Sequence, residues 1–318
     1  MGEKKKIKIG VVGAGHLGTY HLQKYQKIAD CEIVCVADVI PEQAIKAAKE
    51  YQCKALSDHR ELIGKVDAAS VAVTTKSHYE VARDLLSAGI DILLEKPICV
   101  TLKEADELIS IAENTGAILQ VGLIERFNPA ITALETVIQA PLFIESHRLH
   151  PFFNRGTDVD VILDLMIHDL DIILHFVDSP IKDVEAVGVS VLSHNVDISN
   201  ARLTFQNGCV ANVTASRVTG KVLQKIRFFG IEGYHSVDYR KRELVSLRRT
   251  VNDDGHPEIG QNDVNIENYD PLEREIRAFV HSVITREAPL VSGTESRKSL
   301  DLALRIIDKM NTGREMLV

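Results

Sequence analysis

Lysine, aspartate and histidine side chains stand in this 318-residue chain in settings that suit acid–base chemistry. Lys96 lies between Glu95 and Pro97, at the end of a hydrophobic run, and Asp164 precedes His168 by four residues in a mainly apolar segment. A carboxylate one helical turn from an imidazole can orient the ring and tune its pKa towards neutrality, as a general base requires. A nearby ammonium can stabilise an oxygen that loses its proton. We therefore expect Lys96, Asp164 and His168 to be catalytic, although a strand-end lysine can also be an ordinary surface charge.

The segment that holds the aspartate and the histidine has polar residues at helical spacing. Burying such groups without partners costs several kcal/mol, so a polar stripe on an apolar helix must face water, a partner or a cleft. One interpretation is a catalytic helix, and the other is an amphipathic helix with a solvated face. The predicted helix runs from Asp160 to Val177, and the stripe consists of Asp160, Asp164, His168, Asp171 and His175.

A glycine-rich turn near the start of the chain provides a second chemical signal. Gly13, Gly15 and Gly18 directly follow a hydrophobic run and open a helical segment. Glycines in this setting permit a tight turn, a close approach of the backbone to a pyrophosphate, and close helix–strand packing. We predict a dinucleotide site there, which would also include His16 and Leu17.

An acidic residue distinguishes between the two nicotinamide cofactors. Asp38 ends the second hydrophobic run, about 20 residues after the glycines, as expected for such a site. Its carboxylate can accept hydrogen bonds from ribose hydroxyls but would repel a 2′-phosphate, and the next three residues include no arginine. NAD is therefore the expected cofactor. A solvated strand-end carboxylate is the other interpretation of Asp38.

The first half of the chain is expected to form a Rossmann domain, residues 1–123. Continuous hydrophobic runs are typical of parallel strands that helices cover on both faces, so the predicted fold is a doubly wound α/β sheet. Ligands bind beyond the carboxyl ends of such strands, where Asp38 and Lys96 would stand. The runs cover 7–12, 31–37, 68–73, 91–94 and 117–121, with helical segments near 16–28, 41–51, 77–88 and 102–115.

The second half, residues 124–318, is predicted to be an α+β domain with a large, mostly antiparallel sheet. Asn207-Gly208 supplies a tight hairpin turn. Around Val187 and Val189 apolar residues point to both faces, so we expect this sheet to pair with a second subunit in a dimer or tetramer. Residues 252–270 are polar and are predicted to form a surface loop or cover. Alternating strands lie near 142–150, 184–192, 198–205, 208–217, 223–229 and 234–240, and helices near 160–177, 272–286 and 294–311.

Composition and charge argue against several other classes of protein. The net charge is −8, so there is no basic footprint for nucleic acid, and no apolar run reaches the roughly 18 residues that span a bilayer. The hydrophobic run after the basic N-terminus is too short for a signal peptide, so we expect a cytoplasmic protein. The five cysteines have no metal-binding spacing and are interpreted as reduced thiols, with no metal predicted.

Taken together, these motifs resemble the Gfo/Idh/MocA oxidoreductases along essentially the whole chain. The resemblance rests on the glycine turn, Glu95-Lys96-Pro97, Val121-Gly122, the segment 126–129 and Asp164-x-x-x-His168. It implies that Lys96, Asp164 and His168 are the catalytic residues of an NAD-dependent dehydrogenase. We also expect Thr74, His78, Glu95, Lys96 and Gln120 at the cofactor site.

The segments 125–130 and 164–171 look like the branch of this family that contains UDP-N-acetylglucosamine 3-dehydrogenases. This resemblance implies that the substrate is a nucleotide sugar, oxidised at a secondary hydroxyl. A diphosphate requires cationic and polar partners, and the candidates are Arg126, Asn128, Arg148, His150 and Arg155. Two alternatives stay open: a dehydrogenase of inositol or a free sugar, and a sensor that binds sugar and NAD without catalysis.

Overall fold

The computed structural model describes residues 6–152 and 159–315, and the chain divides into two compact units. The first unit combines Met1–Leu123 with Leu272–Arg297, and the second combines Ile124–Pro271 with Lys298–Val318. We expected residues 272–297 in the second domain, whereas the structure groups them with the first. No helix in the described ranges has the length and apolar character needed to cross a membrane.

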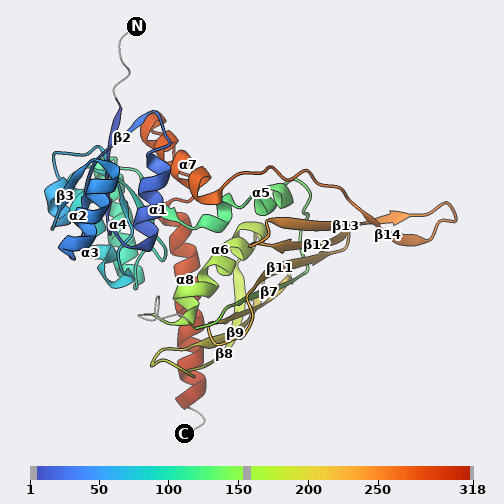
Figure 1. The fold of residues 1–318 in the computed structure, drawn as a ribbon. Helices are drawn as coiled ribbons and strands as arrows, with labels where there is room; N and C mark the ends of the chain where they lie inside the picture. The colour runs from blue at the N-terminus through green and yellow to red at the C-terminus, as the bar shows by residue number, and fades with distance from the viewer. Residues whose placement is uncertain (1–5, 153–158, 316–318) are drawn as a thin grey trace. The chain divides into compact units, whose positions relative to one another are not determined.

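A six-stranded parallel sheet forms the centre of the first unit (Figure 1). Its strand order is β3-β2-β1-β4-β5-β6, so the order reverses between β1 and β4, which is where doubly wound sheets bind their ligands. Five of the strands match predicted runs, and β3 is an addition because its three residues are too few to show a pattern. The bounds are Ile7–Val12 (β1), Cys31–Ala37 (β2), Lys54–Leu56 (β3), Ala68–Val71 (β4), Asp91–Glu95 (β5) and Leu119–Gly122 (β6).

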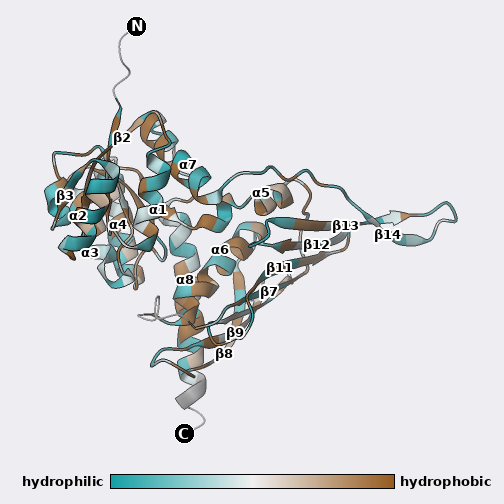
Figure 2. Cartoon of the chain, in the orientation of Figure 1, coloured by the Kyte–Doolittle hydropathy of each residue, from teal (hydrophilic) through white to brown (hydrophobic). Residues whose placement is uncertain are grey.

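Helices flank this sheet, and the strands between them are apolar (Figure 2). The helix α4 begins with a capping box, in which Thr101 and Glu104 each accept a hydrogen bond from the other's backbone N–H. The helices are His16–Tyr25 (α1), Pro41–Tyr51 (α2), His78–Ser87 (α3), Leu102–Thr115 (α4) and Pro271–Thr285 (α7), with short 3₁₀ turns at His59–Leu62 and Thr75–Ser77.

An eight-stranded sheet dominates the second unit, in the order β14-β13-β12-β11-β7-β10-β9-β8. Strands β7 and β10 pair in parallel and the other neighbours are antiparallel. Part of the predicted loop 252–270 is the strand β14, which pairs with β13. The bounds are Phe143–Leu149 (β7), Ile181–Val189 (β8), Ile198–Phe205 (β9), Val210–Ser216 (β10), Leu223–Gly230 (β11), Gly233–Asp238 (β12), Glu243–Val251 (β13) and Pro257–Gln261 (β14).

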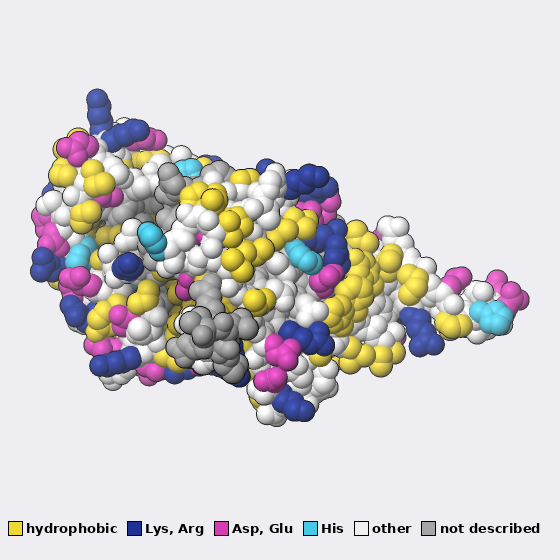
Figure 3. Space-filling model, turned by 90° about the horizontal axis from the view of Figure 1, so that it is seen from below, with side chains coloured by type: hydrophobic (Ala, Val, Ile, Leu, Met, Phe, Trp, Pro, Cys, Tyr) yellow, Lys and Arg dark blue, Asp and Glu magenta, His cyan; other side chains and the backbone are white. Residues whose placement is uncertain are grey.

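One face of this sheet is covered and the other is open. The helix α6, Ile167–Phe176, packs on β7 and β10, and the ring of Phe176 lies 5.3 Å from that of Phe228 on the neighbouring strand β11. On the opposite face the rings of Phe143 and Phe229 lie 5.4 Å apart. Figure 3 shows hydrophobic side chains gathered beside the projecting β13–β14 segment. The other helices are Pro129–Glu135 (α5), the 3₁₀ turn Ile124–Phe127 and Gly293–Glu315 (α8).

Candidate active site

The glycine-rich turn fits a dinucleotide. Gly13 has a φ of +92°, and a Cβ there would lie 2.3 Å from the carbonyl oxygen of Ala72. A Cβ at Gly18 would lie 1.7 Å from the Gly13 carbonyl oxygen, so the helix can approach the turn this closely only because residue 18 is a glycine. Gly15 caps α1 and has open space around its Cβ position. The unsatisfied N–H groups of the helix start therefore face a space that can accept a pyrophosphate.

Asp38 stands beside this turn at the end of β2. Its Oδ2 accepts a hydrogen bond from the backbone N–H of Ala14 at 2.7 Å, and its Oδ1 accepts one from Ile40 at 2.8 Å. Each carboxylate oxygen keeps a second lone pair for a ribose hydroxyl. The next side chain, Val39, is 89% exposed and uncharged. This setting fits the unphosphorylated ribose of NAD.

Other predicted cofactor residues also follow the strands of the parallel sheet. His16 and Leu17 lie exposed in the first turn of α1, while Thr74 follows β4 and Lys96 follows β5. The Oγ1 of Thr74 lies 3.3 Å from the Oγ of Ser77, and Lys96 is half-buried. The structure thus brings these residues, the glycine turn and Asp38 to one edge of the sheet.

His78 has a different position from the one we expected. It is buried, and its Nδ1 lies 2.7 Å from the carbonyl oxygen of Pro97, while its Nε2 lies 3.2 Å from that of Val73. Burial lowers the pKa of the ring, which favours the neutral form. Since both nitrogens face backbone oxygens, His78 holds the loop that contains Lys96 and does not direct a nitrogen at a cofactor.

Glu95 and Gln120 also have internal partners. The Oε1 of Glu95 lies 3.0 Å from the Nε2 of His21, whose Nδ1 lies 2.9 Å from the Oγ of Ser70. The hydroxyl of Tyr25 lies 2.8 Å from the same Oγ. The buried amide of Gln120 donates to the backbone oxygen of residue 275 at 3.1 Å. This network was not predicted from the sequence, although His21 and Tyr25 at helical spacing were a signal for it.

The helix of the second unit differs from the predicted continuous α-helix. Its first part, Ile162–Met166, is a π-helical turn that contains Asp164, and His168 lies in the first turn of α6. Both side chains are half-buried. A π-turn accommodates one extra residue, so the residues before and after it do not share a single α-helical stripe. Such turns occur frequently at functional sites.

The rest of the predicted stripe is divided among separate partners. The Oδ1 of Asp160 accepts a hydrogen bond from the backbone N–H of Val196 at 2.7 Å. Asp171 is buried, with its Oδ2 3.8 Å from Arg126. The Nε2 of His175 lies 2.7 Å from the Oε1 of Glu135. The prediction of one polar face was therefore wrong.

A buried charge cluster under α6 includes one of the predicted substrate residues. Arg148 is 4% exposed, and it donates to the Oδ2 of Asp169 at 2.6 Å and to the Oε1 of Glu125 at 3.0 Å. Its guanidinium also lies over the ring of Tyr239, 4.7 Å from the centroid. Although burial alone would lower the pKa of Arg148, the two carboxylates raise it. Two carboxylates thus pair with the Nε and Nη1 of Arg148, and only its Nη2 has no hydrogen-bond partner among the described residues, so the structure favours a structural role over the predicted contact with a diphosphate.

The remaining predicted substrate residues have different settings. Asn128 caps α5 by accepting from Ala130, and its amide donates to Glu125 and to the carbonyl of Tyr239, each at 3.0 Å. Its hydrogen-bonding groups are therefore used inside the protein, contrary to our expectation. Arg126 is also buried, but its Nε has no hydrogen-bond partner among the described residues. His150 is half-buried, with its Nδ1 2.5 Å from the Pro151 oxygen, and Arg155 lies outside the described residues.

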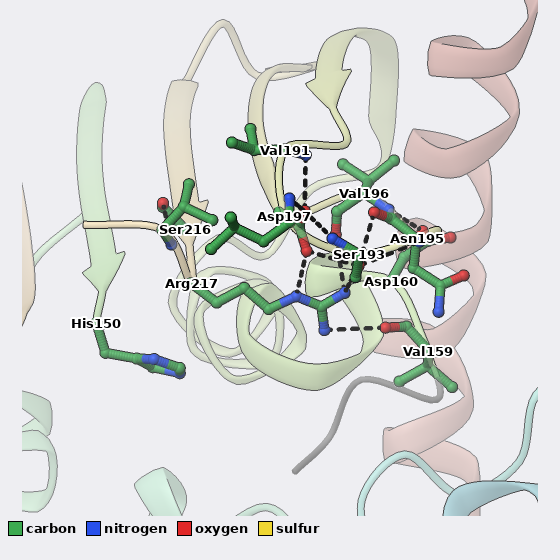
Figure 4. A network of polar contacts seen from close by, with 12 residues as sticks. His150, Val159, Asp160, Val191, Ser193, Asn195, Val196, Asp197, Ser216 and Arg217 are labelled. Atoms are coloured by element: carbon green, nitrogen blue, oxygen red, sulfur yellow. Dashed lines mark hydrogen bonds and ion pairs between the residues drawn. The ribbon is translucent and has the colours of Figure 1, made fainter. Parts of the chain in front are cut away.

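A buried ion pair holds the segment that leads into the π-turn (Figure 4). Arg217 donates to the Oδ1 of Asp197 at 2.9 Å and to the backbone oxygen of Val159 at 3.1 Å. Asp197 also accepts from the Ser193 hydroxyl at 2.7 Å. Burial opposes ionisation, yet the hydrogen bonds from Ser193, its neighbours and Arg217 hold the pKa of Asp197 below its usual range. The network joins Val159 to the end of β10, because Arg217 directly follows that strand.

Comparisons with known proteins match both units. A model described as the oxidoreductase family with an NAD-binding Rossmann fold matches residues 7–123, and the GFO/IDH/MocA C-terminal domain matches residues 135–235. The chain is 36% identical to UDP-N-acetylglucosamine 3-dehydrogenase from Acidithiobacillus ferrooxidans, over 94% of this chain and 96% of that protein. It is 27% identical to myo-inositol 2-dehydrogenase from Thermotoga maritima, over 92% and 93% of the two proteins.

Solved structures share the architecture. A structure of the Acidithiobacillus ferrooxidans enzyme matches with a TM-score of 0.88 at 34% identity, covering 97% of this chain and 99% of that one. Levoglucosan dehydrogenase in complex with NADH and levoglucosan matches with a TM-score of 0.87 at 18% identity, covering 97% and 98%, which shows the fold alone. The predicted fold class and NAD as cofactor are confirmed.

Proposed function

The chain belongs to the Gfo/Idh/MocA family of oxidoreductases, and we propose that it oxidises the 3-hydroxyl of a UDP-linked N-acetylhexosamine. The observation that carries this proposal is the similarity, at 36% identity over 94% of the chain, to a UDP-N-acetylglucosamine 3-dehydrogenase. The more distant inositol dehydrogenases support the broader class, which is the NAD-dependent oxidation of a secondary alcohol.

Three residues divide the chemistry in this proposal. Bound NAD supplies the hydride acceptor, so the protein must remove the hydroxyl proton and stabilise the oxygen. His168 takes the proton, Asp164 orients its ring, and Lys96 stabilises the negative charge on the oxygen. The position of Lys96 after β5 supports its role, since ligands bind at this edge of a parallel sheet. The π-turn at residues 162–166 supports the roles of the other two.

We propose that the residues at the strand ends, where a ligand has room, make the contacts with the cofactor. The turn Gly13–Gly18, including Gly15, His16 and Leu17, would hold the pyrophosphate, and Asp38 would bind the ribose. Thr74 would also contact the cofactor. The open space at Gly15 and the fixed carboxylate of Asp38 support this assignment. For the substrate, Arg126 is the proposed anion ligand, because its Nε has no hydrogen-bond partner in the described part of the chain. His150 is kept as a proposed polar contact.

The direct test is NAD reduction with UDP-N-acetylglucosamine, free N-acetylglucosamine and myo-inositol as separate substrates. We expect turnover with the nucleotide sugar and a kcat/KM at least about 100-fold lower for the two compounds without a diphosphate. Equal rates with the free sugar or inositol would contradict the proposed substrate. Tight binding of sugar and NAD without any NADH formation would favour the sensor.

The open face of the large sheet is the proposed subunit interface. Val187 and Val189 are both at least 50% exposed, and the Phe143 and Phe229 rings lie on the same sheet. A homodimer or homotetramer would cover these apolar groups, and a monomer in light scattering would contradict the assignment. We also propose a cytoplasmic location, because all five cysteines are free thiols, as a reducing compartment maintains them.

A further inference from the structure

Glu275 on α7 is a buried acid that the proposed chemistry does not use. Its side chain is fully buried, and neither carboxyl oxygen has a hydrogen-bond partner among the described residues. Its backbone oxygen accepts the hydrogen bond from Gln120 that ties α7 to β6. An isolated ionised carboxylate in such a place would be costly, so its protonation state matters.

A second buried carboxyl group, Glu95, lies on the same side of β6. Residue 95 pairs with Gly122, and a Cβ on Gly122 would lie 2.9 Å from the Oε1 of Glu95. Gln120 and Gly122 are two residues apart on one strand, so they point to the same face of the sheet. The Gln120 side chain reaches the Glu275 backbone on that face, and the Glu95 carboxylate fills the space beside Gly122. Glu95 directly precedes Lys96.

The groups around Glu275 come from several elements. On α1, His21 lies 3.0 Å from Glu95, and Tyr25 shares the hydroxyl of Ser70 with His21. Burial raises the pKa of Tyr25, so its hydroxyl stays neutral, and burial raises the pKa of Cys31 on β2 to about 12. Glu95 on β5 is the charged group that acts on Glu275. Burial first, and then that charge, raises the pKa of Glu275 well above its usual value of 4.5.

We propose that Glu275 is a positioning residue of the oxidation: as a neutral acid, it limits the buried cluster behind Lys96 to the single negative charge of Glu95. A second negative charge there would oppose the field with which the Lys96 ammonium stabilises the substrate oxygen. The inference rests on the proposed role of Lys96. It predicts that activity falls at alkaline pH, when Glu275 loses its proton.

The first experiment measures the protonation state without any substrate. A group whose folded pKa is raised contributes stability that is present below its unfolded pKa and is lost as pH rises through the folded value. Glu275→Gln keeps the neutral form, so its Tm should rise relative to wild type as pH increases from about 5 to about 9. Glu273→Gln, on the same helix but paired with Arg277 at the surface, should follow wild type at every pH. A constant difference between Glu275→Gln and wild type would overturn the proposal.

The second experiment measures the effect on the reaction, with NAD and UDP-N-acetylglucosamine as reactants. Glu275→Gln should have a kcat within about twofold of wild type near neutral pH. Its kcat should begin to fall in alkali at a pH about one unit or more higher than in wild type. Superimposable pH profiles would overturn the proposal, and so would a folded Glu275→Gln protein that is inactive at neutral pH. Glu275→Met, also uncharged, should behave like Glu275→Gln if the amide variant fails to fold.

A third measurement separates this inference from the proposed substrate. If the nucleotide sugar does not reduce NAD, the substrate assignment fails. The affinities for NAD and NADH still report the charge of Glu275. The oxidised nicotinamide ring is cationic and the reduced ring is neutral, so a second buried negative charge favours NAD over NADH. The ratio of the NADH and NAD dissociation constants should therefore rise with pH in wild type and stay constant in Glu275→Gln. A ratio that changes equally in both proteins would overturn the inference.

Discussion

Asp169, the residue after His168, accepts a hydrogen bond from the buried guanidinium of Arg148 at 2.6 Å. The same guanidinium donates to Glu125, and Asp169 also accepts from the hydroxyl of Ser146. His168, the proposed base, is thus followed directly by Asp169, the residue that bonds their helix to the sheet. This relationship assigns Arg148 a structural role.

Replacing Arg148 with methionine should destabilise the protein by about 3–5 kcal/mol, because the buried carboxylate of Asp169 and the half-buried one of Glu125 would lose their cation. Thermal or denaturant unfolding measures the loss. A substrate ligand would show the opposite pattern, an unchanged stability with a raised KM for the nucleotide sugar. That result would contradict the structural role of Arg148.

Asp197→Asn should weaken the network that holds Val159 and should lower the Tm at neutral pH. The cost expected is about 3–5 kcal/mol, since Arg217 would lose its buried partner. The folded pKa of Asp197 is depressed, so its stabilisation is present above the unfolded value of 3.8 and is lost as pH falls. The Tm difference from wild type should therefore shrink in acid. The exposed Asp183→Asn serves as the control, and an equal effect of both variants would contradict this account.

Gly15→Ala should separate folding from cofactor binding. The added methyl group has open space around it, so the Tm without cofactor should stay within a few degrees of wild type. The same methyl group would obstruct the approach of a pyrophosphate to the turn. We expect NADH affinity, measured by fluorescence titration, to fall by about tenfold or more. Gly220→Ala, which also has open space, is the matched control. Unchanged NADH affinity in Gly15→Ala would remove the turn from the site.

Asp38→Ala should weaken the binding of NAD much more than the binding of NADP. The substitution removes the ribose acceptor and also the negative charge that would repel a 2′-phosphate. Dissociation constants for both cofactors measure the change, and we expect the NAD preference to fall by about tenfold or more. Because Asp38 also accepts from Ala14 and Ile40, Asp38→Asn controls for the loss of these turn contacts. Equal losses for both cofactors would contradict the assignment.

The first unit was largely predictable because its strands are continuous hydrophobic runs that end in chemically distinct residues. The glycine turn, Asp38 and Lys96 lie at strand ends in the structure, as the order of runs and motifs indicates. The local sequence pattern could not show that α7 belongs to the first unit. Its place depends on contacts such as the hydrogen bond from Gln120 to Glu275, which joins residues 155 positions apart.

The second unit was predictable in its sheet but less so in its site. The segment 160–177 is apolar around most of its circumference, so no pattern indicated the π-turn at Asp164. Arg148 is a cation on a strand, and sequence alone does not show which face it occupies or that Asp169 neutralises it. The internal hydrogen bonds of Asn128 were hidden for the same reason.

The central claim is tested most directly by NADH production from UDP-N-acetylglucosamine in wild type, Lys96→Met and His168→Ala. We expect turnover in wild type and a kcat lower by about 100-fold or more in each variant, with the Tm preserved in both variants and NADH binding preserved in His168→Ala. Lys182→Met, at an exposed position on β8, should retain full activity. Full turnover in either Lys96→Met or His168→Ala would contradict the account.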